Sequence, residues 1–254
     1  MEFHDLIVLV CGNANGLGPM IADSTLRRGA RTVILVEERA VASRARQRGD
    51  GELICMSHDA LDGVRHSVDS IRQSGRIDVL INLVSIADHG VSSGSSEESD
   101  GPQLDVACES VVRRTCRIVD ATRDLLQKSR PCGAIVNVGW LATSAGAAMS
   151  PAAAAALDCL KALTQALAKQ LAPYVRVNAV LSEEVAGPVQ ASSAPTTEWP
   201  ISPLEEARVG PALFLASPAA RHMTGSVLIA NAGRRLGFAT FSRPNEAKER
   251  ANVR

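Results

Sequence analysis

The chain has 254 residues, 46% of them hydrophobic, which is enough for the buried core of one α/β domain. The chain has 27 basic residues (Lys plus Arg) and 27 acidic residues (Asp plus Glu), so its formal net charge is zero. It therefore has no excess of basic residues that would attract nucleic acid or an anionic membrane. The first residues lack the basic start of a signal peptide, and no apolar run approaches the ~20 residues that span a bilayer, so we expect a cytoplasmic protein.

Short β-branched runs alternate with helical patterns along the chain. The predicted strands are residues 6–11, 31–36, 52–56, 79–83, 134–138, 176–180 and 226–230. The predicted helices are residues 19–28, 63–74, 104–128, 151–172 and 205–216. The strands are apolar almost throughout, as expected where helices cover both faces of a sheet. This order predicts a Rossmann-like α/β fold, a doubly wound parallel sheet of about seven strands with helices on both faces.

Polar segments separate these elements. Residues 92–101 and 186–203 are rich in Ser, Gly, Glu, Thr and Pro and are predicted to be loops. We expect one domain over residues 1–238, followed by a polar tail at 239–254. The tail is either disordered or an arm packed on a neighbouring subunit.

The first predicted strand runs directly into a glycine-rich turn, GNANGLG at residues 12–18, before a helix. Glycines let the backbone approach a diphosphate, and a helix N-terminus offers free amides to it. A tight strand-to-helix turn would also need them, so the motif alone is weak. The candidate cofactor-binding residues of this turn are Gly12, Asn15, Gly16, Leu17 and Gly18.

Later segments share the order and spacing of one family. They are GRIDVLIN at 75–82, LAPYVRVNAV at 171–180, FLAS at 214–217 and TG at 224–225. With the glycine turn, they make the chain resemble the short-chain dehydrogenase/reductase family over nearly its whole length. The resemblance implies NAD-dependent oxidoreductase ancestry and places Asp59 and Asn82 on the adenosine side of the cofactor. Glu37 falls one residue past the family's ribose-binding acid, so it either binds the ribose or is a solvated surface glutamate.

The family's catalytic side chains are absent at the corresponding positions. Aligned on residues 133–138 and 162–164, the family's serine corresponds to Trp140, its tyrosine to Ala153 and its lysine to Leu157. Its asparagine corresponds to Ala107. None of these side chains can act as the general acid, so we predict no catalytic residue. We also expect the Trp140 ring to fill the substrate's place.

Other reactive side chains are better explained as ordinary structure. Tyr174 is expected to be a packed loop residue, and Lys161 a surface lysine. Ser144, Ser150 and His89 could serve a repurposed reaction, but solvated loop residues are the preferred interpretation. The six cysteines have no metal-ligand spacing, so we predict no metal site and read them as reduced core thiols.

The cofactor pocket is altered as well. The family's Asn-Asn-Ala-Gly reads Asn82-Leu83-Val84-Ser85, which adds bulk, and its Pro-Gly reads Ser182-Glu183, with Glu184 following. Carboxylates there would repel a diphosphate. The sequence therefore favours loss of NAD binding by this chain, with NAD bound by an active partner.

These losses predict a non-catalytic subunit of a heteromeric NAD-dependent dehydrogenase. The expected partner is a catalytically intact short-chain dehydrogenase paralogue, in a hetero-oligomer such as a heterotetramer. Two-subunit dehydrogenases of anaerobic toluene breakdown, with one chain lacking the catalytic residues, resemble this case and suggest a hydroxyacyl-CoA such as 2-(hydroxybenzyl)succinyl-CoA. A dinucleotide-binding regulator and an enzyme with new chemistry remain alternatives. One apolar helix face is either core or subunit interface: Cys108, Val111, Thr115, Ile118, Val119 and Leu125.

Overall fold

A computed structural model shows one parallel sheet of seven strands in the order β3-β2-β1-β4-β5-β6-β7. It describes residues 3–12, 17–36, 53–57, 68–69, 71–86, 100–144, 151–186 and 205–230. The strands are β1 (Ile7–Gly12), β2 (Arg31–Val36), β3 (Leu53–Ser57), β4 (Val79–Ser85), β5 (Gly133–Ser144), β6 (Val175–Ala186) and β7 (Val227–Ala230). The helices are α1 (Leu17–Arg27), α3 (Asp100–Leu126), α4 (Pro151–Leu171) and α5 (Glu205–Ala216), with short 3-10 turns η2 (Arg72–Ser74) and η4 (Pro218–Ala220). The predicted Rossmann-like fold is confirmed.

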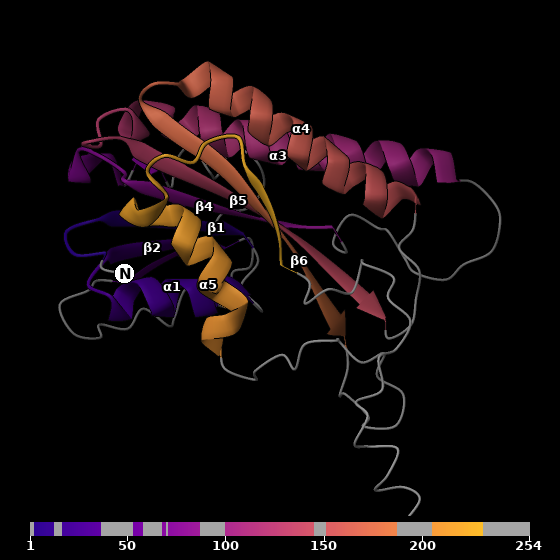
Figure 1. Ribbon diagram of the computed structural model, residues 1–254, viewed down its shortest axis with the longest axis horizontal. Coiled ribbons are helices and arrows are strands. Elements are labelled where there is room, and N and C mark those ends of the chain that lie inside the picture. The colour runs from indigo at the N-terminus through magenta and orange to yellow at the C-terminus, as the bar shows by residue number, and fades with distance from the viewer. Residues whose placement is uncertain are drawn as a thin grey trace, which may run out of the picture.

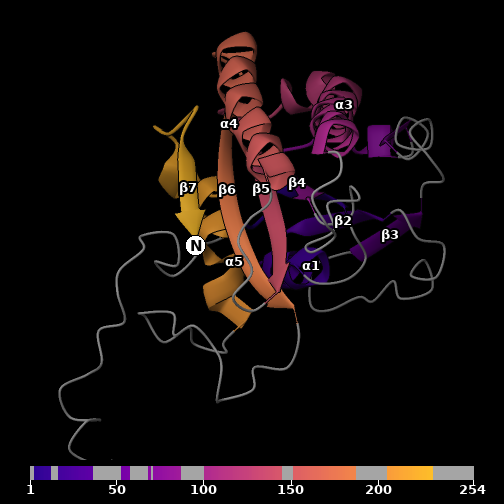
Figure 2. The same ribbon diagram turned by 90° about the vertical axis from the view of Figure 1, so that its right-hand side faces the viewer.

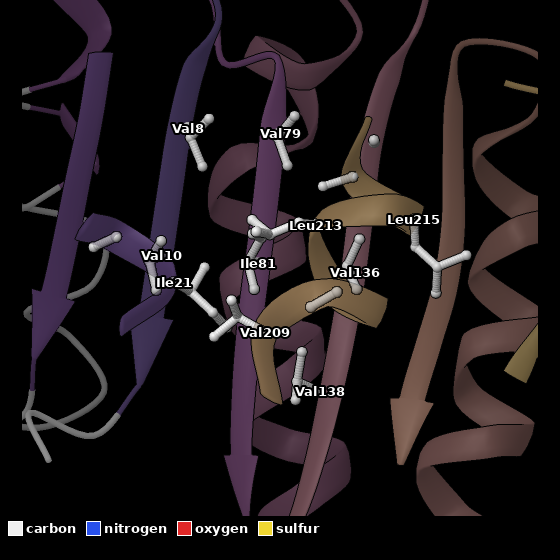
Figure 3. Packing of buried hydrophobic residues seen from close by; sticks show 14 of the residues in the cluster. Val8, Val10, Ile21, Val79, Ile81, Val136, Val138, Val209, Leu213 and Leu215 are labelled. Atoms are coloured by element: carbon white, nitrogen blue, oxygen red, sulfur yellow. The ribbon is translucent and has the colours of Figure 1, made fainter. Parts of the chain in front are cut away.

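Helices cover both faces of the sheet. In Figures 1 and 2, α3 and α4 lie side by side on one face, and α1 and α5 lie on the other. Figure 3 shows Val10, Ile81 and Val136 of three neighbouring strands packed beneath Val209 and Leu213 of α5. Within the described residues, no helix is long and apolar enough to cross a membrane.

The apolar face of α3 was interpreted from the sequence as either core or subunit interface, and the burial of its residues distinguishes the two. Five of its six residues are at most 2% exposed and pack within this chain, whereas Cys108 is half-buried. The face is therefore core. The five buried residues are Val111, Thr115, Ile118, Val119 and Leu125.

Several element boundaries differ from the sequence prediction. Strands β5 and β6 run to Ser144 and Ala186, six residues past their predicted ends, because they pair with each other along their whole length. The extension of β6 was not predicted because the residues after position 181 are polar. Helix α3 begins at Asp100, inside the predicted loop at 92–101. The remainder of both predicted loops and the tail at 239–254 lie outside the described residues.

A buried arginine ties the C-terminal segment to the sheet. Arg176 of β6 is 9% exposed. Its guanidinium donates to the carbonyls of Leu215 at 3.1 Å, Ser217 at 3.4 Å, Ala220 at 3.0 Å and Met223 at 3.4 Å. These carbonyls lie at and beyond the C-terminal end of α5, where a helix dipole favours a cation. Arg176 therefore anchors α5 and η4 beside β6.

We predict that Arg176→Lys lowers the free energy of unfolding by about 1–3 kcal/mol, since the compact ammonium cannot reach all four carbonyls and buried acceptors lose their partners. Chemical denaturation measures the change. Arg221→Lys, at an exposed arginine of the same segment, is the control and should be neutral. Equal stability of the two variants would show that Arg176 is no anchor.

Candidate cofactor and active site

The carboxyl ends of β1 and β4 lie next to each other at the centre of the sheet. Strand β1 ends at Gly12 and pairs with β2 on one side and β4 on the other. The chain leaves β1 for β2 and later returns to β4, so the strand order reverses between them. In open α/β sheets, ligands bind outside the carboxyl ends of strands at such a switch point. This edge is therefore the candidate site.

Gly12 is required by the packing of the two strands. It is buried with φ +151°, and a Cβ there would lie 2.5 Å from the Leu83 Cβ and 3.0 Å from the Leu83 carbonyl oxygen. Leu17 and Gly18 are likewise buried where α1 begins. Close packing alone therefore accounts for the glycine at position 12. Asn15 and Gly16 lie outside the described residues.

Asn82 is part of a hydrogen-bonded chain inside the protein. Its side-chain amide donates to Thr115 Oγ1 at 3.2 Å and to Asn137 Oδ1 at 3.1 Å. Asn137 in turn donates to Thr164 Oγ1 at 3.0 Å. All four residues are at most 4% exposed. The chain links α3, β4, β5 and α4, and it uses both amide hydrogens of the predicted cofactor residue Asn82 internally.

Sequence reasoning missed three members of this chain. Thr115, Asn137 and Thr164 lie on separate elements, and no spacing in the sequence joins them. Asn137 alone carried a signal, since it is a polar residue within an otherwise apolar strand. The candidate residues Glu37 and Asp59 lie outside the described residues.

Three of the four positions aligned with the family's catalytic residues belong to the core. Ala107, Ala153 and Leu157 are 0%, 1% and 2% exposed. They lie in one apolar cluster, here called the α3/α4 cluster, whose buried members are Val84, Ile86, Ala107, Val111, Ala153, Ala156, Leu157, Leu160 and Leu181. These members bring only hydrocarbon side chains to the cluster. None of these buried side chains could donate a proton or bind a ribose.

Strand β5 shows how tightly this cluster is packed. A Cβ on Gly139 would lie 2.9 Å from a methyl of Leu160, 2.9 Å from one of Leu181 and 3.2 Å from one of Leu157. Leu157 therefore packs against the β5 backbone. Its side chain offers no polar group that could bind a nicotinamide ribose. These described residues do not fit the nicotinamide end of a dinucleotide. The next residue, Trp140, pairs through its backbone with β4 and β6, and the predicted role of its ring lies outside what the structure describes.

The alternative reactive residues do not form a second site in the described part of the chain. Tyr174 is 57% exposed at the amino end of β6, so its prediction as a packed residue is wrong. Its carbonyl accepts from Gly133 N, and this turn leaves the ring in solvent on the edge opposite the candidate site. Lys161 pairs with Asp158 at 2.6 Å near the surface, as predicted. Ser144 ends β5, whereas Ser150 and His89 lie outside the described residues.

The thiol of Cys11 lies at this edge too and is unreactive. It is buried, at 8% exposure, and this burial raises its pKa to about 11 against a smaller opposing effect of Arg114. A thiolate is the reactive form of cysteine. Cys11 therefore matches the predicted core thiol and offers no nucleophile at neutral pH.

Known proteins resemble the chain over most of its length. A family model described as enoyl-(acyl carrier protein) reductase matches residues 12–235. L-rhamnose 1-dehydrogenase (NAD(P)(+)) of Azotobacter vinelandii is 30% identical over 92% of this chain and 98% of that protein. Peroxisomal 2,4-dienoyl-CoA reductase of Pongo abelii is 26% identical over 96% of this chain and 87% of that protein. A short-chain dehydrogenase of Leptospira borgpetersenii solved with bound NAD+ has a TM-score of 0.71 at 20% identity, covering 91% and 93% of the two chains, and shows the same fold.

We predict that Leu157→Lys lowers the free energy of unfolding by about 4 kcal/mol at pH 7, since burial depresses a lysine pKa by about 3 units. Between the lowered pKa of about 7.4 in the folded chain and the ordinary lysine pKa, the unfolded chain binds a proton that the folded chain lacks. The loss relative to wild type should therefore shrink as pH rises toward the ordinary lysine pKa of about 10.4.

Denaturation at several pH values measures this effect. Ala162→Lys, at an exposed position of the same helix, is the matched control and should match wild type throughout. A Leu157→Lys protein as stable as this control would mean that position 157 faces an open, solvated cleft.

Proposed function

The chain belongs to the short-chain dehydrogenase/reductase superfamily, and from that premise we propose that it is a non-catalytic subunit of a heteromeric NAD-dependent dehydrogenase. In this assembly it stabilises a catalytically intact paralogue of the same fold. The paralogue binds NAD and transfers the hydride. The chain itself performs no proton transfer.

The α3/α4 cluster is the observation that supports this proposal most strongly. The family's reaction needs a proton donor at the substrate oxygen and a cation beside the nicotinamide ribose, whereas Ala153 and Leu157 are packed hydrocarbon. A positioned general acid contributes about 10²- to 10⁴-fold to rate. Loss of these groups removes the ordinary mechanism, while the helix and sheet that carried them persist.

The same packing argues against a dinucleotide sensor. The contact of Gly12 with Leu83 accounts for a glycine at this position without a bound nucleotide. The substrate proposed for the whole assembly is a hydroxyacyl-CoA, such as 2-(hydroxybenzyl)succinyl-CoA. Similarity to a relative named as a dienoyl-CoA reductase supports the acyl-CoA class. We place the complex in the cytoplasm, as a hetero-oligomer such as a heterotetramer.

We expect purification of the tagged chain from its native source to recover an intact paralogue with the serine, tyrosine and lysine in place. Mass spectrometry identifies the co-purifying chain, and NAD-dependent turnover of acyl-CoA substrates is measured on the complex and on each chain alone. Recovery of a homo-oligomer without a paralogue, or turnover by the isolated chain, would refute the proposal.

Two exposed valines on α3 supply a surface for this contact. Val106 is 56% exposed and Val112 is 38% exposed, so both offer apolar side chains to a partner chain. We predict that Val106→Asp with Val112→Asp abolishes paralogue recovery while the melting temperature of the isolated chain stays unchanged. Tyr174→Asp, at another exposed apolar position, should retain recovery. Loss of the paralogue with the Tyr174 variant alone would move the interface away from α3.

A further inference from the structure

Leu83 of β4 covers the carboxyl end of β1 at the edge of the sheet that holds the candidate site. The two strands pair in parallel as far as Cys11 and Asn82, so Gly12 and Leu83 are the next residues of each strand. A Cβ on Gly12 would lie 3.3 Å from Leu83 Cδ1, in addition to its contacts with the Cβ and carbonyl oxygen of the same leucine. The leucine side chain therefore lies against the last residue of β1.

Leu83 is also packed among other apolar side chains. It is 7% exposed and belongs to the same buried cluster as Val10 of β1 and Leu17 and Ile21 of α1. Figure 3 shows Val10 and Ile21 in this cluster together with Ile81, which precedes Leu83 on the same face of β4. Leu17 is the first residue of α1. Hydrocarbon side chains of β1, β4 and the start of α1 therefore meet in one cluster.

A nucleoside diphosphate would need polar partners at this place. In a doubly wound fold, the diphosphate lies against the end of the first strand and accepts hydrogen bonds from the start of the following helix. Leu83 offers only methyl groups, and both amide hydrogens of Asn82 are donated to Thr115 and Asn137. A charged group placed against hydrocarbon without hydrogen bonds is strongly destabilised. The side chains of these two β4 residues therefore give a diphosphate no hydrogen bond.

We propose that Leu83 determines the nucleotide specificity of this chain, because it closes the crevice that the fold would offer between the carboxyl ends of β1 and β4. Closed in this way, the chain binds no nucleoside diphosphate, and NAD and NADP are excluded with the rest. Loss of the leucine methyl groups would uncover Gly12 and the start of α1. Leu83 retains some exposure, so the space would open to solvent and would not remain a sealed cavity. The proposal concerns this chain alone and does not rest on the subunit role.

The α3/α4 cluster occupies the other face of β4 and would stay closed. Leu83 packs on the face that α1 and α5 cover, whereas Val84, the next residue, belongs to the α3/α4 cluster. An opened crevice should therefore accept the adenosine diphosphate half of a dinucleotide. The nicotinamide half would add no affinity, because the described residues at its end of the site remain packed hydrocarbon.

Isothermal titration calorimetry of the full purified chain with ADP and with NAD+ tests the proposal. We expect no detectable binding of either by the wild-type chain. Leu83→Ala should gain affinity for ADP by at least about tenfold over the wild-type limit, as one hydrogen bond to a charged group would give. NAD+ should bind this variant no more tightly than ADP does. Leu80→Ala is the matched control, since it shortens a fully buried leucine on the opposite face of the same strand, and it should gain nothing.

Saturable binding of ADP or NAD+ by the wild-type chain would overturn the proposal, and this measurement needs no variant to fold. An equal gain in Leu80→Ala, or no gain in a folded Leu83→Ala protein, would overturn it as well. If circular dichroism shows an unfolded alanine variant, Leu83→Val and Leu80→Val, which also lack the Cδ methyl groups, carry the same expectations. Wild-type binding without turnover would leave the non-catalytic role intact, since that role depends on Ala153 and Leu157.

Discussion

The apolar packing of α4 against β5 is the constraint on which the rest of this structure depends. Gly139 has no side chain, and methyl groups of Leu157, Leu160 and Leu181 occupy the space that even one added carbon would need. A residue at position 157 is therefore part of the core. The resemblance to the family places a lysine at this helix position, with its ammonium beside the cofactor. A side chain packed as tightly against the sheet as Leu157 leaves no solvated space for such a charge.

Much of the fold could be predicted from the sequence, because strands buried on both faces read as continuous apolar runs between helical patterns. The prediction failed where tertiary pairing overrides local preference. β6 continues through Ser182, Glu183 and Glu184 since β5 pairs with it there. These polar residues disfavour a strand on their own. The residue at which a strand ends therefore depends on its pairing with the neighbouring strand, which no local sequence pattern reveals.

The candidate site was only partly predictable. The interpretation that the family's catalytic groups are absent came from residue identity, whereas the internal use of Asn82 depends on Thr115 and Asn137, which only the fold brings beside it. Side-chain pairs between distant elements need the helix packing before they can be recognised.

Titration of this chain into its purified paralogue, at saturating NAD and acyl-CoA substrate, tests the central claim most directly. A non-catalytic subunit predicts that turnover per paralogue rises to a plateau at a fixed ratio of the two chains, and that this chain alone gives none. Turnover that grows in proportion to this chain in the absence of the paralogue would contradict the account.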